Sequence, residues 1–153
     1  MRNFNIFQRF KHYLRSAFRE IIVYHNSSLE FRAKLFAIVA GVDQEISEAE
    51  EDIIRSAALK IYSDDENRAT TLWLATKEYV EKIHKNNDLG IDELARDIEK
   101  SIKRNHRFVH KINTDYLEPI VEAQSDQDTK DYQRHIVDFL NGLKQEYTQT
   151  KKL

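Results

Sequence analysis

The sequence predicts a single all-α domain, and three observations lead to this fold class. The chain has 153 residues, the usual size of one domain with one hydrophobic core. It contains three glycines and one proline, far fewer than turn-rich β architectures need. Its apolar residues recur every three or four positions in successive stretches, which is the spacing of one helical face. We therefore expect a bundle of about seven helices.

The first stretch, from Asn3 to about His25, predicts an N-terminal helix. Its apolar residues step by three or four, and residues 1–25 carry five Arg or Lys side chains against one acid, Glu20. Such a helix can pack in the bundle or lie on an anionic membrane surface, and the sequence is compatible with both placements. We expect the main helical domain to span residues 26–147 and residues 148–153 to be a frayed tail.

Three capping boxes predict the starts of the next three helices. In each box a Ser is followed three residues later by a Glu, so that each side chain satisfies a backbone N–H at the helix start. The boxes are Ser27–Glu30, Ser47–Glu50 and Ser63–Glu66. The third of these helices should end near Lys85, because the turn-forming stretch Asn86–Gly90 follows it.

Apolar periodicity predicts the remaining helices. One covers Leu94–Ile102, and after a break near Asn105 another covers Phe108–Ile120. Pro119 lies inside that pattern, so we expect a kink there or a helix restart near Glu118. The last helix follows a turn at Ser125–Asp128, and its apolar pattern consists of Tyr132, Ile136, Phe139, Leu140, Leu143 and Tyr147.

An acidic turn occurs twice, at positions 83 residues apart. The first lies within Ala40–Glu50, between two apolar-periodic stretches. In the second, Ala123, Asp126, Gln127, Ile136 and Val137 stand where Ala40, Asp43, Gln44, Ile53 and Ile54 stand in the first. The chain is therefore predicted to consist of two related helix-turn-helix halves.

These turns resemble those of the TerB-like family, small helical domains named after a tellurite-resistance protein of bacterial stress operons and also found in DnaJ-type co-chaperones. Ala40, Asp43 and Glu50 match the family pattern in the first half, and Ala123 and Asp126 match it in the second. The resembling span runs from about Arg32 to Tyr147. The chain departs from the pattern where Gln44 and Gln127 replace a glycine and Gln133 replaces a glutamate. Because glutamine enters a left-handed turn only at some cost, we expect a reshaped turn.

The resemblance implies an all-α bundle with a pseudo-twofold relation between its halves and no established catalytic activity. It also implies a divalent-cation site among the turn carboxylates and work as an adaptor in membrane-linked stress complexes. A cytoplasmic location, or one at the periphery of the inner membrane, fits that role. The His-Pro-Asp signature of DnaJ-type proteins does not occur in the chain.

Asp43, Glu50 and Asp126 are the candidate metal ligands. Six acids lie between Asp43 and Asp52, and Ca²⁺ or Mg²⁺ takes oxygen ligands in such clusters. A structural role is the alternative, because Glu50 belongs to a capping box and its neighbours suit the positive end of a helix. Convergence of Asp43 and Asp126 would favour a shared ion site, whereas opposite ends of the bundle would leave two separate caps. An EF-hand is not expected, since Glu48 stands at the position of its glycine.

Other classes of site are excluded or weakly indicated. The chain has no cysteine, which excludes disulfides and thiolate chemistry, and no apolar run of the roughly 20 residues that a spanning helix needs. His106 and His110 are four residues apart, but the cations around them would repel a metal. That basic stretch is a solvated face or a patch for an anion or acidic partner, without a nucleic-acid signature.

The sequence thus predicts a non-enzymatic interaction module that binds a protein partner or a divalent cation through its acidic turns. The alternative is a peripheral membrane protein that docks on anionic lipid through residues 1–25. Carboxylates on solvated turns lack the apolar enclosure that tunes acid–base catalysts, so an enzyme is not expected.

Overall fold

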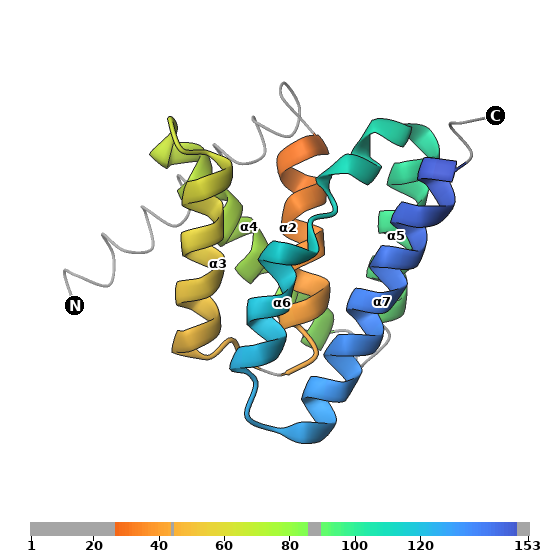
Figure 1. Cartoon of the computed structure of the whole chain (residues 1–153). Coiled ribbons are helices and arrows are strands. Elements are labelled where there is room, and N and C mark those ends of the chain that lie inside the picture. Colours follow the sequence, from red (N-terminus) through yellow and green to blue (C-terminus); the bar gives the residue numbers. More distant parts are fainter. Residues whose placement is uncertain (1–26, 44, 86–89, 150–153) are drawn as a thin grey trace.

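The computed structural model describes residues 27–43, 45–85 and 90–149. These residues form helices and no strands, as predicted (Figure 1). The elements are α2 (Ser27–Ala40), α3 (Glu48–Ile61), α4 (Glu66–Lys85), α5 (Gly90–Arg104), the 3₁₀ helix η1 (His106–Lys111), α6 (Thr114–Ala123) and α7 (Gln127–Gln149). The predicted N-terminal helix over residues 3–25 lies outside the described residues.

Helix α2 lies at the centre of the bundle, where it contacts α4, α5, α6, α7 and η1. Its second half, Leu35–Ala40, is buried at every position. A helix that is apolar on all sides is stable only when other helices cover it, and this explains its central place. Near its start, Phe31 stacks on Phe108 of η1 with ring centroids 5.0 Å apart. The core therefore joins the two halves of the chain around one helix.

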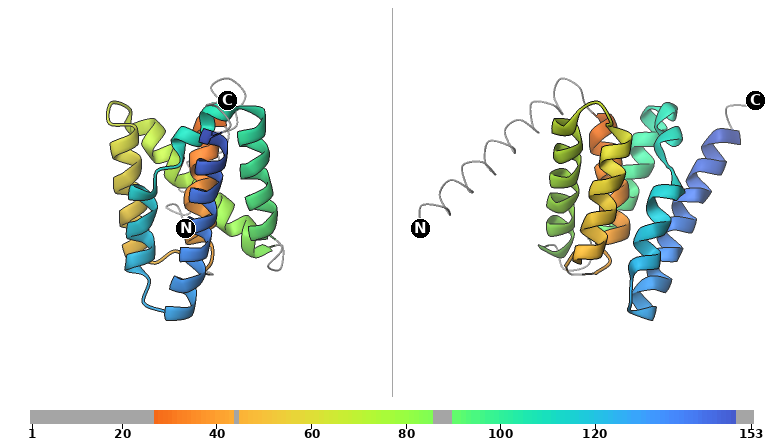
Figure 2. Two further views of the ribbon diagram at one scale, coloured as in Figure 1. Left: turned by 45° about the vertical axis from the view of Figure 1, so that its right-hand side comes forward. Right: turned by 60° about the vertical axis from the view of Figure 1, so that its left-hand side comes forward.

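The turns of the bundle gather at two opposite ends (Figures 1 and 2). The turn from α2 to α3 and the turn from α6 to α7 lie at the same end, which is the lower end in both figures. We call it the acidic end, after the acidic side chains of residues 43–52 and 126–131. The end of α3 and η1 lie at the other end, and α6 begins between the two ends; we call this other end the basic end after Arg32, Lys60, His110 and Lys111.

Two of the predicted helix starts can be compared with the structure in detail. The box at Ser47 is confirmed, because the Glu50 N–H donates to Ser47 Oγ at 3.1 Å and the Ser47 N–H donates to Glu50 Oε1 at 3.3 Å. The box at Ser63 is wrong. Helix α4 begins at Glu66, and Asp65 caps it by accepting the Arg68 N–H at 3.1 Å. An aspartate directly before the helix can accept the N–H three residues later, whereas a box at Ser63 would need the Glu66 N–H and a helix that begins at Asp64.

The predicted restart near Glu118 is also wrong, because α6 begins at Thr114. Asn113 caps it, with its side-chain oxygen accepting the Asp115 N–H at 3.0 Å. Pro119 lies inside α6, which continues past it to Ala123. The proline removes one helical hydrogen bond, and the packing of α6 against α2, α3 and α7 offsets this loss.

Helix α7 buries only part of its apolar pattern. Ile136, Leu140 and Leu143 are buried, whereas Tyr132 is 46% exposed and Phe139 is 39% exposed. These two aromatic residues are seven positions apart and lie on one face of the helix. The core-facing stripe is thus narrower than the sequence pattern.

Candidate functional site

The first acidic turn holds a buried carboxylate. Glu50 is 1% exposed, although it lies in the first turn of α3. Its Oε1 accepts hydrogen bonds from the Ser47 N–H and from Ser47 Oγ, the latter at 3.0 Å. Its Oε2 is buried and has no hydrogen-bond partner among the described residues. A buried carboxylate oxygen normally has a donor, so this position is polar and incompletely satisfied.

The environment of Glu50 disfavours its charge. Burial raises the pKa of the Glu50 carboxyl, hydrogen bonds from Ser47 lower it, and the negative charge of Asp43 raises it further. Asp43 is therefore an electrostatic neighbour of Glu50, as a shared ion site requires. The backbone oxygen of Asp43 lies 2.8 Å from His84 Nε2, which ties the turn to α4.

The second acidic turn uses its aspartate differently. Asp126 is exposed, and its Oδ2 accepts hydrogen bonds from the Thr129 N–H at 2.9 Å and from Thr129 Oγ1 at 2.7 Å. These bonds lower the pKa of the Asp126 carboxyl. Asp126 is thus the N-cap of α7, which begins at Gln127. Gln127 is the first residue of that helix, and a reshaping of this turn relative to the TerB-like pattern stays a prediction.

Gln133, which corresponds to Glu50 in the second half, is fully buried. Its Nε2 donates to the carbonyl oxygen of Val39 in α2 at 3.1 Å, and its Oε1 has no partner among the described residues. The two equivalent positions therefore both hold a buried polar side chain with one unsatisfied oxygen. In the sequence Gln133 stands out only as a departure from the family pattern, and its equivalence to Glu50 is the signal that could have revealed its burial.

The structure brings the three predicted ligands to one end of the bundle but engages them differently. Asp43 and Glu50 interact electrostatically, whereas Asp126 is occupied by its own helix cap. Within residues 27–43, 45–85 and 90–149, no group of three or more His, Cys, Asp or Glu side chains is arranged to hold a metal ion. A metal at Asp43, Glu50 and Asp126 stays a prediction.

His106 and His110 do not form a site with each other. They lie on η1, a 3₁₀ helix with about three residues per turn, so positions four apart do not share a face. The His106 ring packs edge-on against Tyr147, with centroids 5.7 Å apart. These histidines belong to the packing and the surface of the basic end.

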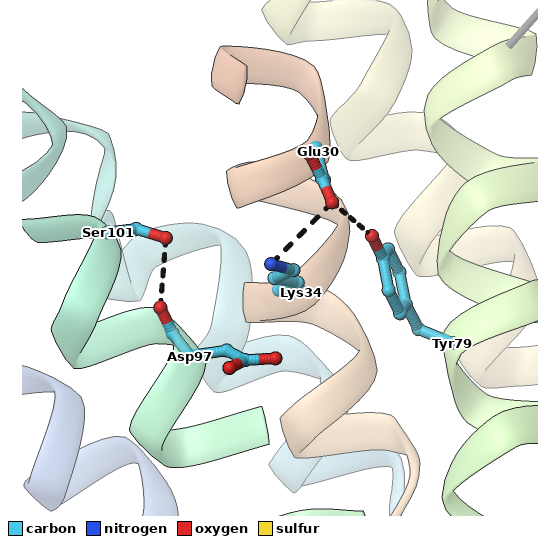
Figure 3. A network of polar contacts seen from close by, with 5 residues as sticks. All are labelled: Glu30, Lys34, Tyr79, Asp97 and Ser101. Atoms are coloured by element: carbon cyan, nitrogen blue, oxygen red, sulfur yellow. Dashed lines mark hydrogen bonds and ion pairs between the residues drawn. The ribbon is translucent and has the colours of Figure 1, made fainter. Parts of the chain in front are cut away.

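A second polar cluster lies between α2 and α4, and Figure 3 shows it. Tyr79 donates its hydroxyl to Glu30 Oε1 at 2.7 Å, and Lys34 lies 3.6 Å from the same oxygen. Burial, together with the Glu30 carboxylate, raises the pKa of the Tyr79 hydroxyl. The Lys34 and Lys82 ammonium groups lie 5.8 Å and 5.5 Å from the Tyr79 ring centroid. Since the hydroxyl is engaged and stays protonated, this cluster fastens two helices together.

No helix within the described residues is long and apolar enough to cross a membrane. Comparison with protein-family models, with curated proteins and with solved structures finds no significant match. The structure defines the chain as a single-domain helical bundle with two acidic turns at one end. The resemblance to the TerB-like family stays a prediction.

Proposed function

We propose that this chain is a non-enzymatic, TerB-like interaction module whose acidic end binds a positively charged surface of a partner protein or a divalent cation. The observation that carries the proposal is that both acidic turns lie at the same end of one bundle. Glu45, Glu48 and Asp52 from the first turn and Asp126 and Asp128 from the second are exposed there. Carboxylates held together on a rigid scaffold attract cationic groups and steer their approach.

The exposure of these acids supports binding in preference to catalysis. A catalytic acid or base needs a pKa tuned by a water-poor pocket and a position facing a substrate. Asp126 instead has a lowered pKa because it caps α7, and Glu45, Glu48 and Asp128 lie in water. Glu50 is the only buried acid among those of the acidic end, and it is committed to the capping box.

The cation part of the proposal rests on Glu50 and Asp43. The pKa of Glu50 is raised partly by Asp43, and one buried oxygen of Glu50 lacks a donor within the described chain. A divalent cation at this position would stabilise the ionised forms of both groups. Calorimetric titration with Ca²⁺, Mg²⁺ and Mn²⁺ is expected to give heat that Asp43→Ala removes. An absence of heat and of any thermal shift at millimolar metal would reduce both acids to structural roles.

The partner-protein part is tested by charge reversal at matched positions. The double variant Glu45→Lys with Asp128→Lys alters one turn residue and one first-turn helix residue of the acidic end, both exposed. The control is the double variant Asp64→Lys with Glu66→Lys at the start of α4. It changes the net charge by the same amount, again at one exposed turn residue and one exposed residue in the first turn of a helix. Proteins cross-linked to the tagged chain in a cell lysate should be lost only with the first variant. Equal retention or equal loss with both variants contradicts a docking role for the acidic end.

A further inference from the structure

The basic end contains a pocket of about 300 Å³ that the acidic turns do not share. Its volume lies at the lower limit of the roughly 300–1,000 Å³ typical of ligand pockets. The lining residues come from α2, α3, η1 and the start of α6, four elements that only the fold brings together. They are Arg32, Lys60, Ile61, His110, Lys111, Asn113 and Tyr116.

The charge of this pocket has one sign. Arg32, Lys60 and Lys111 line it, and none of its lining residues among the described part of the chain is acidic. None of the three forms a salt bridge within residues 27–43, 45–85 and 90–149, although other cations of the bundle do. Asp115, in the first turn of α6, is exposed and does not line the pocket. Within the described residues, no acid therefore lines the hollow that these three cationic side chains share.

Two of these cations repel each other in the absence of a ligand. Arg32 and Lys111 are both half-buried, and burial together with the charge of Arg32 lowers the pKa of the Lys111 ammonium. The Arg32 guanidinium lies over the Tyr62 ring, 5.5 Å from its centroid, which holds it in place. A fold that keeps two partly desolvated cations together without an acid gains stability when an anion enters.

The remaining lining groups add hydrogen-bond donors. The Asn113 side-chain oxygen accepts the Asp115 N–H, which leaves its amide nitrogen as the donor. Tyr116 lies one turn further along α6, lines the same hollow and carries a hydroxyl group. The start of α6 also presents the positive end of a helix dipole to the pocket.

The geometry points to a phosphate monoester group as the ligand of this pocket. A dianionic phosphate has several acceptor oxygens in different directions, and the residues that line the pocket carry guanidinium, ammonium, amide and hydroxyl donors. A carboxylate carries one charge and would leave most of these donors unused. An adjoining hollow of about 10 Å³ shares Arg32 and Lys111 and reaches Leu35, Phe36 and Leu117, but it has room for no more than about one water-sized group, so the rest of the ester would lie outside it.

The test uses the full chain and inorganic phosphate, the smallest form of this ligand. Isothermal titration calorimetry should give saturable binding that chloride at the same ionic strength does not reproduce. Lys111→Gln or Arg32→Gln should weaken binding at least about tenfold, because each removes a charge-assisted hydrogen bond. Lys85→Gln, an exposed lysine at the end of α4, is the matched control and should leave affinity unchanged.

Stability separates loss of binding from loss of fold. Lys111→Gln relieves the repulsion with Arg32, so its midpoint of thermal unfolding without phosphate should equal or exceed that of the wild type. Added phosphate should raise the midpoint of the wild type and of Lys85→Gln but not that of Lys111→Gln. Equal phosphate affinity in the wild type and Lys111→Gln, or heats matched by chloride, would overturn the proposal.

Vesicles distinguish the sources of the phosphate group. Phosphatidylcholine vesicles containing phosphatidic acid present a phosphate monoester, whereas those containing phosphatidylserine present anionic lipid without one. Sedimentation with phosphatidic acid alone, abolished by Lys111→Gln, identifies a lipid headgroup. Phosphate binding without sedimentation identifies a soluble phosphate compound. Equal sedimentation with both lipids, or binding of a polyglutamate peptide but not of phosphate, contradicts the assignment.

Discussion

The two acidic turns share a sequence pattern but start their second helices in different ways. Both first helices end at the matching alanine, Ala40 in α2 and Ala123 in α6. Helix α3 then begins only at Glu48 with Ser47 as its cap, whereas α7 begins at Gln127 with Asp126 as its cap. The motif therefore fixes where the first helix ends and which later residue is buried, but not where the second helix begins.

The buried residue itself differs between the turns in charge. Glu50 presents a carboxylate to its capping serine, and Gln133 presents an amide donor to the α2 carbonyl of Val39. A carboxylate suits a helix start, where backbone N–H groups face it, and an amide suits a helix end, where carbonyls face it. Exchanging the two residue types between the turns is the sharpest way to test this distinction.

Gln133→Glu should have the largest effect. It removes the donor to Val39 and places a buried carboxylate against that carbonyl oxygen. We expect a loss of about 3 kcal/mol or more in the free energy of unfolding at neutral pH, measured by urea denaturation. Acidification should restore part of the loss, because a protonated carboxyl can again donate to Val39. A deficit that does not change with pH would mean that packing, and not charge, decides this position.

Gly41 marks the next difference, since Gln124 stands at the equivalent position of the second turn. A Cβ at Gly41 would lie 2.5 Å from the Ala37 carbonyl oxygen and 2.7 Å from Ile83 Cδ1. Gly41→Ala should therefore destabilise the protein by about 1–3 kcal/mol in urea denaturation, as overpacking does.

Gly142→Ala is the control for this change within the same chain. Gly142 lies inside α7, is exposed, and would place its Cβ in open space. The same substitution should there stabilise the protein by about 0.5–1 kcal/mol, because alanine is the better helix former. Similar losses at both glycines would show that the close approach of α2 to α4 does not constrain Gly41.

Asp126→Ala and Asp43→Ala compare the two aspartates of the motif. Asp126→Ala should lower the midpoint of thermal unfolding because α7 loses its N-cap, though by less than Gly41→Ala lowers it. Asp43→Ala should lower it less, because the substitution removes a like-charged neighbour of Glu50.

The pH dependence identifies the cap at Asp126. Its pKa is lowered in the folded state, so its contribution is present above the ordinary pKa of about 3.9 and is lost as the pH falls through the folded-state value. The difference between Asp126→Ala and the wild type should therefore vanish in strong acid. An unchanged difference there would contradict capping by the ionised carboxylate.

Much of this structure follows from local sequence signals, and the exceptions have physical causes. The helical periodicity and the Ser47 box were sufficient to predict the bundle and the start of α3. The sequence left a cap at Asp126 open as the alternative to a metal ligand, because whether it caps depends on where α7 begins, and Gln127 favours helix where a glycine would favour a turn.

The basic pocket was beyond sequence reasoning for a different reason. His110 and Lys111 lie in a basic stretch that the sequence shows, but Arg32 and Lys60 are isolated cations in other helices. Only the packing of α2, α3, η1 and α6 brings them together, and no periodicity or motif encodes that packing locally. The burial of Glu50 likewise depends on the packing of α3 against α4 and α6.

Glu50→Gln should have the smallest effect, and its sign is the informative quantity. The pKa of Glu50 is raised in the folded state, chiefly by burial, so the protonated form is favoured by folding. The stability of the wild type should then fall as the pH rises from the ordinary value of about 4.3 through the folded-state pKa. The glutamine side chain of the variant cannot ionise, yet its amide oxygen can still accept from Ser47, as Glu50 Oε1 does.

The variant should therefore gain stability relative to the wild type across that pH range and keep a constant advantage above it. Thermal unfolding of both proteins in buffers from about pH 4 to pH 8 measures the difference. If the stability advantage of Glu50→Gln grows with pH and Ca²⁺ or Mg²⁺ reduces it, the wild-type carboxylate binds the cation. Parallel curves would show instead that Ser47 compensates fully for the buried charge, and the two turns would then differ only in helix start.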